Sequence, residues 1–363
     1  MKKAILVLLA FWTIVFSASA QKESQSKFVI GRGTNLAHWL SQSKNRGEER
    51  RLFIQENDIA YIAGLGFEHV RLPIDEEQMW DEQGNRHKDA FELMTHCIDW
   101  SIKYNLRVIV DLHILRSHHF NAKEKPLWTD PKEQAKFCDM WRDLSSALKK
   151  YPVSMVAYEL MNEAVADDAE DWNKLLAECF AAVREREPER IIVIGSNRWQ
   201  SVNTFDELKV PEDKNIILSY HFYEPFLLTH YHASWTSLKG YTGAVHYPGV
   251  ILTQKEFDTL PEDQKDEAKK WIGKVFNKQL MTEMMKQPFK KAKELNLPLY
   301  CGEYGVLKGA PEEDRLRWYT DMMEIFNENN VGSANWNYKS GSFGLVANDN
   351  SKHQNLIEIV AGK

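Results

Sequence analysis

Two glutamates, Glu163 and Glu303, each follow a short apolar run, and such a pair of carboxyls could carry out acid–base chemistry at a glycosidic bond. One carboxyl must be protonated to donate to the leaving oxygen, while the other is ionised to attack, or to activate water, at the anomeric carbon. Their environments must therefore differ. We expect Glu303, with Arg71 and Tyr223 nearby, to stay ionised, and Glu163, in a less cationic setting, to hold its proton near neutral pH.

The elements that must position these carboxyls are short β-rich runs alternating with longer amphipathic segments. Eight candidate strands lie at residues 28–33, 67–72, 107–112, 154–161, 191–195, 216–222, 298–303 and 331–336. Between them lie helical patterns, such as the apolar stripe Leu316, Tyr319, Met323 and Phe326. This order predicts a single (β/α)8 barrel, because an open doubly wound sheet would require a glycine-rich phosphate turn that GRGTNL does not provide.

Polar side chains stand at the ends of these runs, and in a barrel the carboxyl ends of the strands form the active-site mouth. They are Arg71, Asp111 and His113, Asn162 and Glu163, His221 and Tyr223, Glu303, and Trp336. Any one of them could be a solvated loop residue or a helix cap. Together they predict one mouth, where glutamates of the fourth and seventh strands face each other.

Six of these segments resemble glycoside hydrolase family 5, the cellulase family. They are HVRLPI with Arg71, VDLH with His113, ELMNEA with Asn162 and Glu163, SYHFYEP with His221 and Tyr223, CGEYG with Glu303, and ANWNY with Trp336.

The resemblance covers nearly all of the predicted mature chain, and it implies a retaining β-glycosidase without metal or cofactor. It makes Glu163 the acid/base and Glu303 the nucleophile. By the same resemblance, the other matching residues bind substrate or support the glutamates: Asn162 hydrogen-bonds the sugar 2-hydroxyl, Arg71 and Tyr223 orient the nucleophile, His113 and His221 contact the site, and Trp336 stacks under the sugar ring.

The resemblance favours an endo-β-1,4-glucanase that cleaves β-linked glucan by double displacement. Two departures from the family pattern limit this transfer: Ala164 stands where the family has proline, and HILRSHHFN follows the third strand in place of a Pro-Gly-rich turn. The alanine should not affect the chemistry, since that proline donates no proton. The loop leaves open the same mechanism on mannan, xyloglucan or β-1,3-glucan, or exo-action on oligosaccharides.

Two other classes of function remain open at this stage. A metal-dependent barrel hydrolase could use His113, His221 and Glu303 as ligands, and chelator-insensitive activity would argue against it. His118 and His119 with His113 could also be considered as a metal cluster, although such loops usually hydrogen-bond hydroxyls. A non-catalytic glycan-binding protein is the third class, and it would have no use for a proton donor opposite a nucleophile.

Residues 1–20 have the pattern of a secretory signal peptide: Lys2 and Lys3, an apolar run over residues 4–16, and a cleavage site after Ala20. We expect a secreted or periplasmic protein with one catalytic domain over residues 21–363. No later run is long enough to span a membrane. The net charge of −6, without a long basic run, argues against nucleic acid as a partner. The expected partner is a polysaccharide or oligosaccharide substrate, and the oligomeric state stays open.

The cysteines, an acidic stretch, a long segment after the sixth strand and four tryptophans allow further predictions. The four cysteines show no paired spacing, which predicts buried free thiols. The acidic stretch 167–171 is typical of a helix start. The segment 224–278 predicts a long insertion after the sixth strand, which could wall off one end of the cleft or flank an open groove. Four tryptophans could be sugar-stacking walls or core packing: Trp39, Trp128, Trp199 and Trp235.

Overall fold

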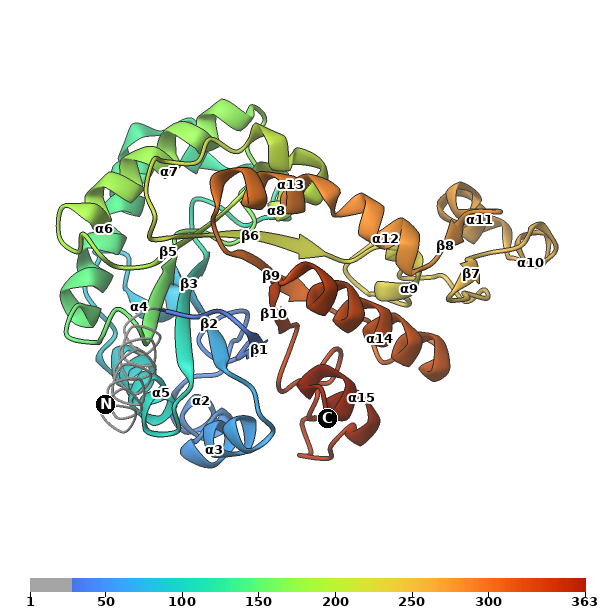
Figure 1. Cartoon of the computed structure of the whole chain (residues 1–363), viewed down its shortest axis with the longest axis horizontal. Coiled ribbons are helices and arrows are strands. Elements are labelled where there is room, and N and C mark those ends of the chain that lie inside the picture. The colour runs from blue at the N-terminus through green and yellow to red at the C-terminus, as the bar shows by residue number, and fades with distance from the viewer. Residues whose placement is uncertain (1–27) are drawn as a thin grey trace, which may run out of the picture.

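The computed structural model describes residues 28–363, so the predicted signal peptide lies outside the described residues. Within this range, eight parallel strands close into a barrel that helices surround (Figure 1). The barrel strands are β1 (Arg32–Asn35), β2 (His69–Asp75), β3 (Arg107–Ile114), β4 (Val156–Glu159), β5 (Ile192–Gly195), β6 (Ile216–Phe222), β9 (Leu299–Tyr304) and β10 (Gly332–Asn335). Each strand pairs with the next along the chain, and β10 pairs with β1. The predicted (β/α)8 fold is confirmed.

The larger helices pack against the outside of the barrel. They are α2 (Gly47–Phe53), α3 (Glu56–Gly64), α5 (Lys88–Lys103), α6 (Pro131–Leu148), α7 (Ala169–Arg184), α12 (Lys278–Met284), α13 (Lys286–Leu295), α14 (Glu312–Asn329) and α15 (Gln354–Ala361). Shorter pieces are α4 (Glu76–Met79), η1 (Pro126–Trp128), α8 (Asn197–Gln200), η2 (Val202–Glu207) and α9 (Phe226–Thr229). The predicted apolar stripe lies on α14, where Tyr319, Met323 and Phe326 are buried. Among residues 28–363, no helix is both long and apolar enough to cross a membrane.

Strand alternation divides the buried residues into two layers. Along β3, Val108, Val110 and Leu112 pack toward the helices, while Ile109 belongs to a cluster inside the barrel. Because successive side chains point to opposite faces of a strand, Asp111 and His113 follow Ile109 into the barrel. The outer face of β3 thus packs against the helices, and its inner face places polar groups at the mouth of the barrel.

The first strand begins later than predicted. The expected run was 28–33, whereas β1 spans Arg32–Asn35. Phe28 instead closes the inner cluster, packing with Ile109, Ala157 and Val193. Phe28 is buried and Ile30 packs against the same cluster, whereas Val29 is exposed, so the two alternate apolar residues of this segment reflect burial of the chain rather than pairing in the sheet.

The predicted insertion after β6 contains the antiparallel pair β7 (Gly249–Val250) and β8 (Val275–Phe276), with α10 (Gln254–Asp258), α11 (Glu262–Ala268) and η3 (Lys269–Trp271) between them. These elements project away from the barrel (Figure 1). Their base is fixed to α14, where the Tyr247 hydroxyl donates to Asp321 Oδ2 at 2.6 Å. All four cysteines are buried free thiols, as predicted.

Candidate active site

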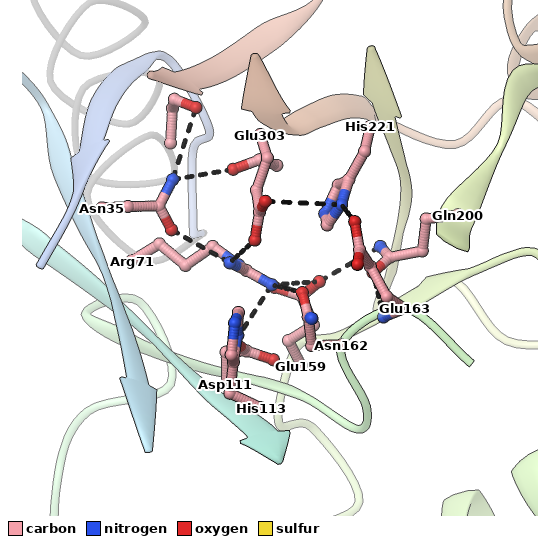
Figure 2. A network of polar contacts seen from close by, with 12 residues as sticks. Asn35, Arg71, Asp111, His113, Glu159, Asn162, Glu163, Gln200, His221 and Glu303 are labelled. Atoms are coloured by element: carbon pink, nitrogen blue, oxygen red, sulfur yellow. Dashed lines mark hydrogen bonds and ion pairs between the residues drawn. The ribbon is translucent and has the colours of Figure 1, made fainter. Parts of the chain in front are cut away.

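Arg71 is the centre of the polar network inside the barrel mouth (Figure 2). Its side chain is fully buried. Nε donates to Glu159 Oε2 at 2.6 Å, and Nη1 donates to Glu303 Oε1 at 2.8 Å. Nη2 lies 3.0 Å from Asp111 Oδ2. A buried guanidinium is stable here because its rigid fork of donors meets several carboxylates at once.

Arg71 was expected at the end of a strand, but it lies in the middle of β2. The expected run ended at residue 72, one residue before Pro73, whose nitrogen cannot donate to a ladder. In the barrel, β1 pairs with β2 only as far as Asn35 opposite Arg71, and Pro73 lies beyond that last pair. The strand therefore continues through Pro73, with Arg71 well below the rim.

Glu303 comes from β9, where a bulge turns it toward the mouth. Cys301 packs toward the helices, so strict alternation would also direct Glu303 outward. The register with β6 shifts by one residue here: Tyr220 pairs with Cys301, and His221 pairs with Glu303. Gly302 is the extra residue, and a Cβ on it would lie 3.1 Å from His221 Nε2. A bulge of this kind re-aims a side chain.

Both oxygens of Glu303 accept hydrogen bonds. Arg71 donates to Oε1, and the Tyr223 hydroxyl donates to Oε2 at 3.0 Å. Burial raises the pKa of Glu303, while the Arg71 charge and the Tyr223 hydrogen bond oppose that rise. Burial and the charge of Glu303 raise the pKa of Tyr223 well above its usual value, so the phenol keeps its proton and remains a donor.

Glu163 lies in the loop after β4, with its backbone in the left-handed region at φ 45°. Such a conformation costs a non-glycine residue about 1 kcal/mol or more, so neighbouring contacts must hold it. The buried Gln200 amide does so: its Oε1 accepts from the Glu163 backbone N–H at 2.9 Å. Burial, followed by the negative charge of Glu303, raises the pKa of Glu163 well above its usual value.

The two glutamates therefore differ in the direction predicted from sequence. Arg71 contacts Glu303 directly, whereas the nearest basic side chain to Glu163 is His221, whose Nδ1 lies 2.9 Å from Oε1. Burial lowers the pKa of His221 well below its usual value, so this imidazole is neutral. One oxygen of each glutamate lies within 4.8 Å of the other. The site thus pairs a carboxyl whose pKa is raised well above its usual value with a second carboxyl whose raised pKa is opposed by the Arg71 charge and the Tyr223 hydrogen bond.

One group in residues 28–363 has the spacing to hold a metal ion: Glu163, His221 and Glu303. The predicted metal set contained His113 in place of Glu163. In the structure His113 Nδ1 instead lies 2.6 Å from Asp111 Oδ2, so His113 is not part of this group. The donor set also fits a cation poorly. Both Glu303 oxygens already accept hydrogen bonds, and the Arg71 guanidinium occupies one side of that carboxylate.

The remaining predicted residues lie beside the glutamates. Asn162 Oδ1 accepts from Arg71 Nη2 at 2.9 Å, and Asn162 Nδ2 has no hydrogen-bond partner among the described residues. His113 stacks on Trp336 with ring centroids 5.4 Å apart and planes 8° apart. Burial lowers the pKa of His113 to about 3, so this ring is neutral. All eight predicted site residues therefore meet in one place.

Two hollows meet at Glu163 and form the cleft. The first has a volume of about 400 Å³ and contains Glu303, Asn162 and Trp336 in its lining. The second has a volume of about 430 Å³ and is lined by Trp199 and His221, among others. Both hollows share five lining residues: Phe120, Glu163, Tyr223, His230 and Trp235.

The four tryptophans that could stack on sugars or pack in the core divide into two pairs. Trp39 is fully buried and its Nε1 donates to Arg50 O at 2.7 Å, so it is part of the core. Trp128 packs edge-on against Trp172 and lines neither hollow. Trp199 and Trp235 are 43% and 55% exposed and face the cleft. Trp235 belongs to the insertion after β6, which also contributes His230 to both hollows.

Three residues of the network were missed from sequence: Asn35, Glu159 and Gln200. Glu159 was inside a predicted strand, and a charged residue at an inward position indicates a buried partner of opposite charge, here Arg71. Asn35 donates to Gly302 O at 2.9 Å and so links β1 to β9. No feature of the sequence indicates the role of Gln200, because the groups that it hydrogen-bonds come from separate strands.

The closed (β/α)8 barrel with two carboxyls facing each other at its mouth is the architecture of a retaining glycoside hydrolase. Residues 28–342 match the family described as Cellulase (glycosyl hydrolase family 5). The chain belongs to this family.

Similar proteins agree with this assignment. Endoglucanase C of Acetivibrio thermocellus is 35% identical over 342 residues, which cover 91% of this chain and 97% of the relative. Cellodextrinase A of Ruminococcus flavefaciens is 28% identical over 83% of each chain. A solved hyperthermophilic endo-β-1,4-glucanase, in complex with substrate, has a TM-score of 0.73 and 26% identity, covering 92% of this chain and 97% of its own.

Proposed function

We propose that this protein is a retaining endo-β-1,4-glucanase, with Glu303 as the nucleophile and Glu163 as the acid/base. The observation that carries the proposal is the separation of the two carboxyls, with one oxygen of each within 4.8 Å. Retaining glycosidases hold their carboxyls about 5 Å apart, whereas inverting enzymes leave room for a water between them. The endoglucanase relatives, similar over nearly the whole chain, support endo-acting hydrolysis of a glucan. The similar solved endo-β-1,4-glucanase supports β-1,4-glucan as the substrate.

The mechanism has two displacements. In the first, a Glu303 oxygen bonds to the anomeric carbon, and the glycosidic oxygen leaves with the proton of Glu163. In the second, water attacks the same carbon, Glu163 takes its proton, and the bond to Glu303 breaks. The contacts of Arg71 and Tyr223 support Glu303 as an ionised nucleophile, and the raised pKa of Glu163 supports it as the initial acid.

The supporting residues have matching roles in this proposal. Asn162 Nδ2 is a buried donor without a partner among the described residues, and a hydroxyl beside the reacting carbon would satisfy it. Trp336 presents its ring to the first hollow, with its orientation fixed by His113. His221 stays neutral and contacts both carboxyls, at 2.9 Å from Glu163 and 3.7 Å from Glu303.

The test is hydrolysis of soluble β-1,4-glucan, mannan, xyloglucan and β-1,3-glucan by wild type, Glu163→Gln and Glu303→Gln. We expect wild type to act best on β-1,4-glucan, with viscosity falling early relative to the release of reducing ends. Both variants should lose about 10³-fold or more in kcat. Glu92→Gln, an exposed glutamate on α5, is the matched control. Preference for another polymer would reassign the substrate, and short products alone would indicate exo-action.

The products formed with added azide distinguish the nucleophile from the acid/base. In Glu163→Ala, azide should attack the glycosyl-enzyme and yield a β-glycosyl azide, because the configuration is retained. In Glu303→Ala, azide should take the place of the nucleophile and yield the α-glycosyl azide. If Glu163→Ala gave the α-glycosyl azide and Glu303→Ala gave the β-glycosyl azide, Glu163 would be the nucleophile and Glu303 the acid/base. Activity of wild type that a chelator abolishes would instead favour the metal-dependent alternative.

We further propose that the chain is exported and that residues 21–363 form its one catalytic domain. The amino-terminal sequence pattern supports this, and so does the match of the cellulase family to residues 28–342. Amino-terminal sequencing of protein recovered from outside the cytoplasm should begin at Gln21. An intact Met1 on the exported protein would contradict cleavage.

A further inference from the structure

Two of the four cysteines lie side by side between α6 and α7, which are neighbours on the outside of the barrel (Figure 1). Cys138 is on α6 and Cys179 is on α7, and both belong to the core cluster between the strands and the helices. The Cys179 thiol hydrogen-bonds the Cys138 sulfur. The other two cysteines lie on other elements, Cys97 on α5 and Cys301 on β9.

The register of the two helices accounts for the contact between the thiols. Successive helices of a (β/α)8 barrel run in the same direction. Near their carboxyl ends, Ser145 Oγ donates to Glu187 Oε1 at 2.7 Å, and the Glu187 N–H continues the helical pattern by donating to Val183 O. About two helical turns before Ser145 the chain reaches Cys138, and about two turns before Glu187 it reaches Cys179. The packing of both helices therefore holds the thiols together.

The surroundings of Cys138 favour its thiolate, which is the nucleophilic form of a cysteine. The hydrogen bond from Cys179 and the charge of Arg142, about one turn further along α6, lower the pKa of Cys138. Burial raises the pKa of Cys179 well above its usual value, so this thiol keeps its proton and donates. Cys138 is also 6% exposed, whereas the other three cysteines are fully buried. The pair thus has a nucleophilic sulfur next to a second thiol.

We propose that Cys138 and Cys179 form a disulfide on exchange with a disulfide oxidant such as oxidised glutathione. The Cys138 thiolate attacks one sulfur of the oxidant, and the first glutathione thiolate leaves. The Cys179 sulfur then attacks the Cys138 sulfur, and its proton passes to the second glutathione as that leaves. Two protein thiols are oxidised, and one disulfide of the oxidant is reduced to two thiols. The proposed export would bring the chain into an oxidising compartment.

This disulfide would join two helices that hold the backbone near the candidate active site. Trp141 on α6 donates from Nε1 to Leu160 O at 2.8 Å, just before the loop that carries Glu163. Trp172 on α7 donates from Nε1 to Gly195 O at 2.9 Å, at the end of β5. The bond would also close a long loop that contains β4, which restricts the unfolded chain and so stabilises the folded state. The oxidised protein should therefore unfold at a higher temperature.

The first experiment maps the bond. The protein is equilibrated with oxidised and reduced glutathione about 10 °C below its unfolding temperature, where local opening exposes buried thiols. It is then unfolded, alkylated, digested and analysed by mass spectrometry. We expect a peptide pair joined through Cys138 and Cys179, with Cys97 and Cys301 alkylated. Four alkylated cysteines, or a bond that involves Cys97 or Cys301, would overturn the proposal.

The second experiment measures Tm of each protein after equilibration with oxidised glutathione and after reduction with dithiothreitol. Oxidation should raise the Tm of wild type by about 5 °C. Cys138→Ser and Cys179→Ser should show no such difference, whereas the matched control Cys97→Ser should keep it. Because each difference is taken within one variant, a lower stability of the variant does not affect it. A rise in Cys138→Ser equal to that in wild type would contradict the bond. The catalytic roles proposed for the two glutamates do not enter either experiment.

Discussion

The hydrogen bond from Tyr223 to Glu303 contributes to the ionisation of a single carboxyl. It favours the ionised form of Glu303, because the phenol donates to Oε2 at 3.0 Å. Arg71 acts in the same direction from the other oxygen, and both oppose the effect of burial. Because the proposed nucleophile Glu303 must be ionised to attack, the lower pH limit of activity should depend on Tyr223.

Tyr223→Phe should shift this limit toward higher pH. Removing a donor to the ionised form raises the pKa of Glu303, so the acidic limb of the kcat/KM profile moves upward while the basic limb stays in place. We expect kcat to fall about 10-fold or more. Tyr61→Phe, on α3 outside the site, is the control. Profiles of kcat/KM between pH 4 and 9 would check this, and an unmoved acidic limb would contradict it.

Apart from Arg71, which lies in the middle of β2, the predicted residues met in the site because they stand at or just after strand ends, where the fold fixes their position. Glu303 and Asn162 follow short apolar runs, so their place was determined once the barrel was inferred. Glu159 and Gln200 could not be placed in the same way. Their roles depend on partners from β2 and β6, and these contacts exist only after the barrel closes.

At the scale of elements, strand order was predictable and strand limits were less so. The β6 run coincided with its prediction at residues 216–222, since its apolar pattern matches its pairing. The first strand was misplaced because Phe28 is buried without being paired. The bulge that aims Glu303 inward also escaped prediction, because Gly302 indicates a close approach but does not give its partner.

The helix start predicted from the acidic stretch 167–171 gives a test at the same scale. Asp168 is the N-cap of α7, and its Oδ1 accepts from the Glu170 backbone N–H at 2.9 Å. Asp168→Ala should destabilise the protein by about 1 kcal/mol and lower Tm by about 1 to 2 °C. Asp167→Ala removes the same charge one residue earlier, outside the cap, and should have a smaller effect. Equal Tm values for the two variants in calorimetry would contradict the capping role.

For the whole molecule, buried carboxyls should make stability depend on pH. Burial raises the pKa of Asp75 to about 7, and the same cause raises the pKa of Asp111 to about 7. Asp75 is almost completely buried, and its Oδ2 accepts from the Gln42 backbone N–H at 2.7 Å. The folded state holds these protons more tightly than the unfolded chain does, whose aspartates titrate near 4. Between pH 4 and 7 the folded state therefore binds more protons, and the free energy of unfolding falls as pH rises.

Asp75→Asn tests this sign, because the amide keeps an acceptor for Gln42 N–H but does not titrate. Relative to wild type, the variant should gain about 2 kcal/mol in unfolding free energy between pH 5 and pH 8, since only wild type must lose a proton from this site. Asp263→Asn, an exposed aspartate on α11, is the matched control and should keep a constant difference from wild type. Denaturant unfolding of the three proteins at pH 5, 6, 7 and 8 measures the effect. If the difference between Asp75→Asn and wild type stayed constant across this range, Asp75 would have to be ionised at pH 5 already, stabilised by its contact with the loop that carries Gln42 into the cleft.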